Sequence, residues 1–327
     1  MASPNSNFPG DLLAVTVQEL EDELFDNILT KNATTAALKE YGAVEPKDGG
    51  PTVAVPVMYA VNESYKRYSG AEQLNTSSNE VFAVFQYVWY QIALNIQANG
   101  REILQNMGRS QNRDLVKSRV MNAKATYENQ FNIDILSDGS LTNQIVGLQG
   151  LISDNGTGTV GNVSRTTYPF AKNQFYRATT DGGAAMNKVN IVDYMDSLDL
   201  LIQEQRGKTK VILADDYTFK YYEGNVAALQ RLTPTGNGNN TLAKLGFNTY
   251  AYKQAEVVFE PSASGMPTYT QYWIDPEVLS LMPHSSRNLA RLPKRDSFNQ
   301  DAQIEYLATM VAFGAKNYKR LGVLDND

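Results

Sequence analysis

The chain has 327 residues, of which 42% are hydrophobic and 20% charged, a composition typical of ordered globular proteins. Its 29 basic and 35 acidic side chains give a formal charge of -6, whereas a protein that grips nucleic acid over a broad face is usually basic, so this function is not expected. The absence of cysteine excludes disulfides and thiolate metal sites, and the single histidine, His284, excludes a His/Cys zinc cluster.

The first 50 residues predict an arm, because they hold too few apolar residues to bury a core of their own. VQELEDELFDNIL (17–29) places apolar residues at helical spacing between acids, and VEPKDGGP (44–51) breaks regular structure. No basic segment followed by an apolar run opens the chain, and no stretch approaches the ~18 apolar residues of a membrane span. We therefore expect a soluble protein that is made in a cytoplasm.

Two strand-like runs predict an extended hairpin. TVAVPVMYAV (52–61) alternates like a strand, and Pro56 in its middle places it at a sheet edge or bulge. After a polar, turn-rich excursion, VFAVFQYVWYQIALNIQ (81–97) predicts the returning strand. Because an isolated two-stranded hairpin is marginal in water, this one must lie on its own domain or on a neighbouring subunit.

A long helix is predicted over 110–137. Ser110 or Asn112 can cap its N-terminus, and Gly139 follows its C-terminus. The predicted apolar stripe consists of Val116, Val120, Ala123, Tyr127 and Phe131.

The segment from about 145 to 265 alternates between helical and strand-like patterns, which predicts a mixed α/β domain. Asp215 or Asp216 is expected to cap its second helix. The predicted elements are helices at 188–206 and 217–232 and strands within 210–214, 247–261 and 268–283, followed by a long strand that starts near 302.

The loop ISDNGTGTVGNVSRTTYPF (152–170) contains the spacing G-x-G-x-x-G at Gly156, Gly158 and Gly161. A dinucleotide fingerprint needs a helix that opens at its last glycine, but the residues after Gly161 are β-branched and precede Pro169. Asp181 stands where a ribose-binding acid is expected, yet TTDGG predicts a turn. The glycines are therefore predicted to let a surface loop turn sharply, and a nucleotide-dependent enzyme is a remote alternative.

No catalytic, cofactor-binding or metal-binding residue is predicted. Two pairs of carboxylates lie close together in the sequence. Asp215 and Asp216 stand where a helix needs its cap, and Asp193 and Asp196 stand on the solvent-facing side of another helix. His284 is expected to be an exposed or hydrogen-bonded loop residue.

The remaining features predict association between copies of the chain. The sequence has 19 tyrosines and few charges, and aromatic enrichment with charge depletion is typical of interface cores. The basic group around Arg287 and Arg291 is either a solvated loop or an ion-pairing patch for an acidic neighbour such as the segment ELEDEL. The candidate subunit-interface residues are Tyr59, Lys66, Arg67, Trp89, Arg287 and Arg291.

The order of these elements resembles the major capsid protein of tailed bacteriophages, of the Hong Kong 97 type. Local runs that carry the resemblance are NGREILQNMG before the long helix, GTVGNVSRTTYPFAKNQF after it, LGFNTYAYKQAEVVFEPSA, and the closing KNYKRLGVL. The resemblance covers residues from about 45 to 324 and depends on order and spacing, since no single motif is a chemical signature.

The resemblance implies an α+β fold and a shell-forming structural protein that is not an enzyme. The implied parts are an N-terminal arm (1–49), an extended loop (50–80), a peripheral domain (81–144 and 266–327) with a spine helix at about 110–137, and an axial domain (145–265).

The same resemblance implies partners and a location. The chain is expected to form hexamers and pentamers with itself, to need a separate scaffolding protein and a portal protein, and to touch packaged double-stranded DNA weakly on its inner face. It would lie in the virion after assembly in the cytoplasm of a host bacterium. Lys66 is a conceivable donor for a Lys–Asn cross-link. An encapsulin-type cellular shell protein, which shares the fold, is the main alternative.

Overall fold

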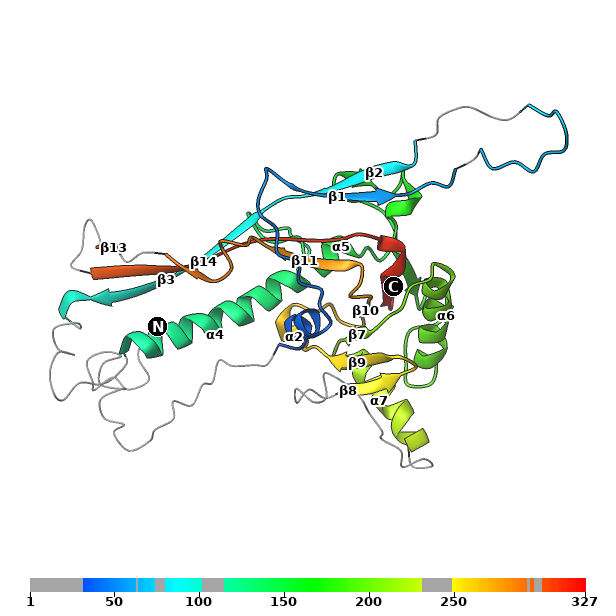
Figure 1. Cartoon of the computed structure of the whole chain (residues 1–327). Helices are drawn as coiled ribbons and strands as arrows, with labels where there is room; N and C mark the ends of the chain where they lie inside the picture. The colour runs from blue at the N-terminus through cyan, green and yellow to red at the C-terminus, as the bar shows by residue number, and fades with distance from the viewer. Residues whose placement is uncertain are drawn as a thin grey trace.

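The computed structural model describes residues 32–62, 64–73, 80–101, 115–230, 249–292, 295–296 and 302–327, and the structural statements below concern these residues. The acidic segment 17–29, the predicted caps Ser110 and Asn112, and the end of the predicted helix 217–232 lie outside them. Helices and sheets share the described part of the chain, so the predicted α+β class is confirmed (Figure 1).

The predicted hairpin is present, but its second strand is shorter than expected. β1 (Val53–Met58) pairs antiparallel with β2 (Phe82–Tyr87) over six residues. The prediction of one strand over 81–97 is wrong, because the chain leaves the hairpin after Tyr87 and continues as β3 (Tyr90–Asn99). β3 pairs with β14 (Ala302–Ala315) along its whole length, a ladder that the six-residue β1 cannot offer.

β14 is the central strand of a second sheet. It pairs antiparallel with β3 and with three strands that follow one another in the chain: β11 (Leu279–Pro283), β12 (Ala290–Arg291) and β13 (Arg295–Asp296). The predicted long helix is α4 (Leu115–Leu136), which lies along β3 and β14 (Figure 1). Ala123, Tyr127 and Phe131 of the predicted stripe are buried, as expected.

A six-stranded sheet forms the other half of the molecule. Its order is β6 (Gln174–Arg177), β15 (Gly322–Asp325), β10 (Gln271–Ile274), β7 (Val211–Ala214), β9 (Ala255–Phe259) and β8 (Thr249–Tyr252). Two pairs, β6–β15 and β7–β9, are parallel, and the others are antiparallel. The strands of this sheet come from residues before and after residue 265, the predicted end of the axial domain. The predicted division into domains stays a prediction.

Two helices pack against the six-stranded sheet, close to where they were predicted. α6 (Ile191–Glu204) buries an apolar stripe against it, and α7 (Asp216–Gln230) follows β7 directly. Asp215 caps α7, because its carboxylate accepts hydrogen bonds from the N–H groups of Tyr217 (3.3 Å) and Thr218 (2.9 Å).

Short elements connect these parts. One buried carboxylate, on Glu260, accepts hydrogen bonds from the backbone and hydroxyl of Thr34 and from Asn132 of α4, which ties the first described helix to α4 and to the end of β9. The short elements are α2 (Ala33–Glu40), α5 (Leu148–Leu151), β4 (Thr159–Val160), β5 (Val163–Ser164), and the 3-10 turns η1 (Pro169–Ala171), η2 (Ser262–Ser264) and η3 (Tyr318–Arg320). Within the described ranges, no helix has the length and apolar character to cross a membrane.

Candidate assembly surface

The inner face of the β1–β2 hairpin packs onto the body of the molecule. Phe85 and Tyr87 of β2 are 1% and 5% exposed, and Val53 of β1 is buried beside them. The Phe85 ring meets the edge of Tyr318 at 5.3 Å and lies 5.8 Å from Phe170. The base of the hairpin therefore belongs to the main hydrophobic core.

A buried group of hydroxyls fixes the position of this inner face. The Tyr87 hydroxyl donates to the carbonyl of Ala315 (2.7 Å), accepts from its N–H (3.1 Å), and lies 2.9 Å from the Tyr318 hydroxyl. Burial raises the pKa of Tyr87 to about 12, so its hydroxyl stays neutral over the physiological range. The ring needs Gly314 beneath it, because a Cβ there would lie 2.3 Å from the Tyr87 Cζ.

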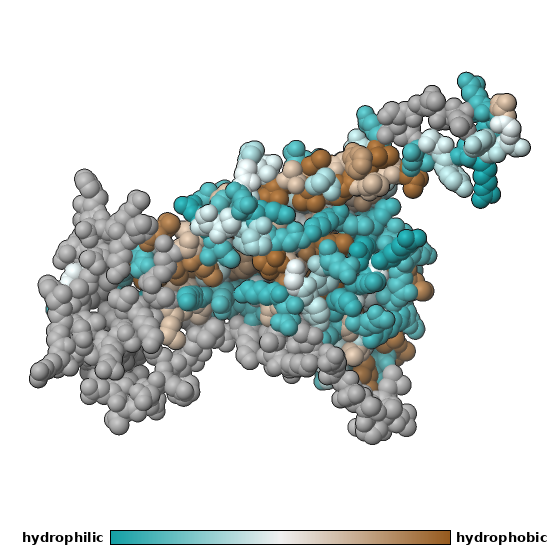
Figure 2. Space-filling model, viewed as in Figure 1, coloured by the Kyte–Doolittle hydropathy of each residue, from teal (hydrophilic) through white to brown (hydrophobic). Residues whose placement is uncertain are grey.

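The outer face of the same hairpin is apolar and exposed. Met58 and Phe82 are direct cross-strand partners and are 71% and 69% exposed. Pro56 and Val84 form the next pair on this face, and Val88 follows at the end of β2. Figure 2 shows hydrophobic residues gathered over this part of the molecule. Contiguous exposed apolar surface of this kind marks an interaction site in soluble proteins.

Beyond Met58 the described residues of the predicted loop project away from the body (Figure 1). Tyr59 is half-exposed at the start of this projection and stacks on Phe170, with ring centroids 4.9 Å apart. Tyr65 and Tyr68 are strongly exposed further along it. Lys66 pairs with Glu72 at 2.9 Å. The loop therefore presents aromatic side chains to the outside.

The predicted interface residues fall in different surroundings. Tyr59, Lys66 and Arg67 lie on the projection, and all three are exposed. Trp89 is half-buried, its indole N–H donates to the carbonyl of Gly50 (3.0 Å), and its ring lies 5.7 Å from His284.

The two arginines of the predicted basic patch lie near the second sheet. The Arg287 guanidinium donates to the Gln91 side chain at 3.3 Å, and Arg291 pairs with Leu307 through the β12–β14 ladder. His284 is a hydrogen-bonded loop residue as predicted, since its Nδ1 accepts from the N–H of Ser286. An interface role for the six predicted residues stays a prediction.

The glycine loop turns the chain and does not open a helix. Gly161 and Asn162, both with positive φ, form the two-residue turn between β4 and β5, and the carbonyl of Gly161 accepts from the N–H of Gln86 in β2. A Cβ on Gly161 would lie 2.9 Å from that of Phe85. The buried Arg165 guanidinium closes the loop by donating to the carbonyls of Thr157 and Gly150. The prediction that the glycines serve backbone geometry is confirmed.

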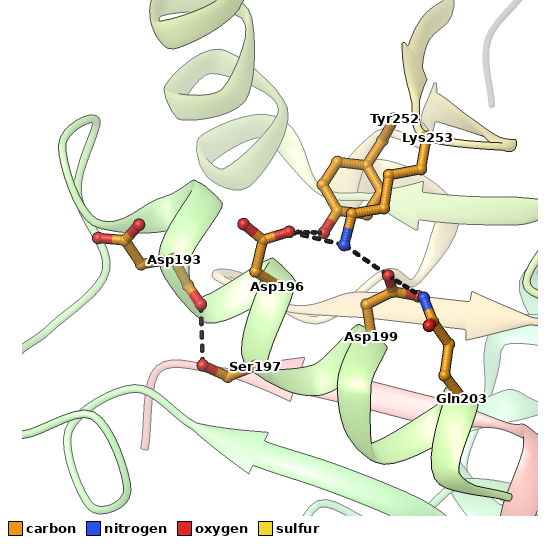
Figure 3. A network of polar contacts seen from close by, with 7 residues as sticks. All are labelled: Asp193, Asp196, Ser197, Asp199, Gln203, Tyr252 and Lys253. Carbon is orange, nitrogen blue, oxygen red and sulfur yellow. Dashed lines mark hydrogen bonds and ion pairs between the residues drawn. The ribbon is translucent and has the colours of Figure 1, made fainter.

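One acid of the pair on α6, Asp196, takes part in a polar network at the edge of the six-stranded sheet (Figure 3). Lys253 of the β8–β9 turn bridges Asp196 at 2.8 Å and Asp199 at 2.6 Å, and the Tyr252 hydroxyl donates to Asp196. Burial acts to raise the pKa of Asp196, but the hydrogen bonds from Lys253 and Tyr252 outweigh it and lower the pKa. Asp193 points away from this network, so the carboxylates that fasten the β8–β9 hairpin to α6 are Asp196 and Asp199.

The described residues contain no group of three or more histidine or acidic side chains arranged to hold a metal ion. The surface that stands out is therefore the outer face of the β1–β2 hairpin with its projecting loop. Sequence reasoning missed Met58, Phe82 and Val84 as members of it. The sequence offers no signal for this face, because the residues of β2 are apolar on both faces.

Comparison with known proteins identifies the fold. No protein-family model matches the sequence, and no curated protein matches it. Among solved structures, the capsid of cyanophage A-1(L) superposes with a TM-score of 0.64 at 14% identity, covering 94% of this chain and 95% of that chain. The capsid of an empty GTA particle gives 0.58 at 13% identity with 95% of each chain covered, and the capsid of cyanophage Pam1 gives 0.56 at 11% identity with 94% and 96% covered.

The chain has the fold of phage capsid structures along nearly its whole length, and the fold expected from the resemblance is confirmed.

Proposed function

We propose that this chain is a major capsid protein, which self-assembles into the icosahedral shell around the double-stranded DNA genome of a tailed bacteriophage. The observation that carries the proposal is the extent of the fold likeness, which spans 94% of this chain and 95% of the A-1(L) capsid chain.

The β1–β2 hairpin supports this function physically. Its inner face is fixed to the core by Phe85 and Tyr87, while its outer face exposes Met58 and Phe82 to solvent. This apolar surface does not stabilise a subunit that is isolated in solution. When a neighbouring copy covers it, the association is stabilised by about 25 cal/mol for each Å² of apolar area buried. In a shell, each subunit should bury more than the roughly 1,200–2,000 Å² of an ordinary interface.

Within this function we assign residues 50–80 to an extended loop, 1–49 to an arm, 145–265 to an axial domain and the remainder to a peripheral domain with its spine helix. The projection beyond Met58 and the path of α4 along β3 support the assignment. Hexamers and pentamers of the chain, a separate scaffolding protein and a portal protein are the proposed partners. The formal charge of -6 fits weak contact with packaged DNA. The role is structural, without a catalytic step, in a virion that is assembled in the bacterial cytoplasm.

Assembly of the purified chain tests the proposal. Negative-stain microscopy and sedimentation of the purified chain, with and without a candidate scaffolding protein, should show closed particles. Met58→Asp and Phe82→Asp should leave the subunit folded by circular dichroism but stop particle formation, because a charge on this face cannot be covered without desolvation. Met58→Leu is the matched control and should assemble. A compact single subunit that never closes into particles would contradict the function, and particles that package a protein cargo instead of DNA would favour the encapsulin alternative.

A further inference from the structure

The strand β3 lies at the margin of the second sheet (Figure 1). β14 pairs with β3 along one edge and with β11, β12 and β13 along the other. Among the described residues, no strand pairs with the outer edge of β3, which is ten residues long. An open edge of this length is a template for pairing with another strand.

The hydrogen bonds of β14 show which residues of β3 face the open edge. The N–H of Met310 donates to the carbonyl of Arg287, and its C=O accepts from the N–H of His284. Both partners lie on the side of β14 away from β3. Gln91, the register partner of Met310, therefore belongs to a non-hydrogen-bonded pair, and its own N–H and C=O point away from β14.

Two more residues follow the same alternation. The C=O of Tyr306 accepts from the N–H of Leu292, on the β12 side, so its register partner Asn95 also directs its backbone groups outward. Ala93 lies midway between Gln91 and Asn95 and has the same phase. Within the described ranges, the outward N–H and C=O groups of these three residues have no backbone partner.

The open section ends at Gln97. This residue has the same phase, but its carbonyl accepts a hydrogen bond from the Arg119 guanidinium of α4. The α4 helix therefore closes the far end of the edge, and the backbone groups that remain open belong to residues 91–95.

The composition of β3 does not protect this edge. Natural sheets keep exposed edges from pairing with charged residues, prolines or bulges, whereas YQIALNIQAN contains no charge, no proline and no glycine. Gln91, Ala93 and Asn95 are exposed on the face away from α4. On the opposite face, Ile92 and Leu94 pack against the main core but are only half-buried.

A strand of the same sequence is the partner that fits these side chains. Each amide carries both donors and acceptors, so a row of amides can form hydrogen bonds with a copy of itself. Two uncharged strands bring no like charges together. We propose that two copies of the chain join their β3 strands antiparallel, across a two-fold axis that passes beside Ala93.

The open groups fix the register of this pairing. Outward-facing residues must meet outward-facing residues, and an axis beside Ala93, the middle one, is the only symmetric choice that pairs all three. Ala93 then faces its own copy, and Gln91 faces Asn95 of the partner subunit. Each of the three pairs exchanges two backbone hydrogen bonds. On the α4 side, the half-buried Ile92 meets Leu94 of the partner subunit, so this face also gains apolar cover.

The symmetry of the contact places it within a shell. A two-fold contact is isologous, whereas the rings of a hexamer or pentamer close through head-to-tail contacts. The β3–β3 contact therefore joins subunits of two neighbouring rings. This placement rests on the proposed shell function, but the pairing of the two strands does not.

Cysteine cross-linking tests the pairing, because the full chain contains no native cysteine. Ala93→Cys, Gln91→Cys and Asn95→Cys are prepared as separate variants, all exposed on the same face of β3. Each is oxidised alone, and the last two are also oxidised as an equal mixture. The series is run in the native chain and in the Phe82→Asp background, which should not close into particles. Linked dimers are measured by non-reducing electrophoresis and by mass spectrometry of the joined peptides.

The register predicts a specific pattern of yields. Directly paired residues have Cα atoms about 5.5 Å apart, within the 4.4–6.8 Å that a disulfide requires, so Ala93→Cys should link to itself. Gln91→Cys and Asn95→Cys should each fail alone, because their copies lie four residues apart along the strands, about 14 Å. The mixture should link. We expect Ala93→Cys and the mixture to exceed each single control at least about tenfold.

Similar yields for all three single variants, or no dimer from Ala93→Cys in either background, would overturn the pairing. A link from Ala93→Cys to another protein instead of a second copy would also overturn it. Dimers with this pattern in a chain that never forms particles would support the pairing and contradict the shell function. Closed particles in which Ala93→Cys does not link would do the reverse.

A charge at the axis tests the placement between rings. Ala93→Lys puts two like charges opposite each other, while Ala93→Thr is the matched control with a neutral side chain. Both variants should fold, as checked by circular dichroism, because Ala93 is exposed. Ala93→Lys should yield separate rings and at least about tenfold fewer closed particles than Ala93→Thr. Closed particles in equal number from the two variants would refute the placement.

Discussion

The substitution Tyr87→Phe removes one hydroxyl from the base of the hairpin and tests whether that base is fixed. The ring stays in place over Gly314, so packing is conserved. The three contacts of the hydroxyl, to the Ala315 carbonyl, to the Ala315 N–H and to the Tyr318 hydroxyl, are lost together.

The expected loss of stability follows from the burial of the partners. Ala315 is 1% exposed and Tyr318 is fully buried, so water cannot replace the missing hydroxyl. A buried donor or acceptor that is left without a partner costs about 1–3 kcal/mol, and we expect a total loss of about 2–3 kcal/mol.

The same hydroxyl predicts a dependence on high pH. Burial raises the pKa of Tyr87 to about 12, while tyrosine in the unfolded chain titrates near 10. Between these values the folded state retains a proton that the unfolded state has lost, so stability falls as the pH rises from 10 to 12, by about 3 kcal/mol at most. Below pH 10 the contribution of this group is complete and constant. Tyr222, whose pKa burial also raises to about 12, titrates in the same window, so Tyr87→Phe should flatten the pH profile without abolishing it.

Urea denaturation of the unassembled subunit measures both effects. Tryptophan fluorescence monitors unfolding in two regions, since Trp89 lies at the base of the hairpin and Trp273 is buried in the six-stranded sheet. Tyr65→Phe is the control, because Tyr65 is 80% exposed on the projection. If Tyr87→Phe were as stable as Tyr65→Phe at pH 7, the hairpin base would not be fixed in the way the hydrogen bonds indicate.

Three further substitutions test other parts of the fold, each by urea denaturation against wild type. Asp215→Ala should cost about 1–2 kcal/mol by removing the cap of α7, and Asp215→Asn should restore most of it. Gly161→Ala should cost about 1–3 kcal/mol more than Gly183→Ala, because both glycines have positive φ but only Gly161 has a neighbour within 4 Å of the new Cβ. Lys253→Met should cost less than about 1 kcal/mol, because the lysine is half-exposed. The stability difference between wild type and Lys253→Met should shrink below pH 4. Although burial acts to raise it, the pKa of Asp196 is lowered by the ion pair, so its contribution to the free energy of unfolding is complete above the pKa of a free carboxyl and is lost as Asp196 becomes protonated.

Much of the fold could be predicted because local patterns and packing agree. The stripe that includes Ala123, Tyr127 and Phe131 has helical spacing and faces the second sheet, and Asp215 stands where a cap is needed. The glycine loop could also be interpreted, because a helix must follow a phosphate-binding turn and the residues after Gly161 favour a strand.

The end of the hairpin could not be predicted for a physical reason. Residues 81 to 97 are apolar on both faces, since Phe82 and Val84 alternate with Phe85 and Tyr87. Periodicity therefore gives no sign of the place where the chain changes sheets, and the place is set by β14, which lies about 200 residues away in the sequence and pairs with Tyr90 to Asn99. Long-range pairing overrides local pattern in such strands.

The same two-faced pattern explains why the exposed surface was missed. Because β2 has apolar residues on both faces, the sequence indicates that each face is buried. It does not show whether a face is buried by other residues of the same chain or by a partner protein. The structure resolves this for one face, because Phe85 and Tyr87 are packed on Tyr318 and Phe170. Turning Met58 and Phe82 inward would expose that packed face and break the hydroxyl contacts at Ala315. Since the hairpin cannot hide both faces on its own chain, the outer face needs cover from outside it, and the proposed shell would supply that cover in the form of further copies.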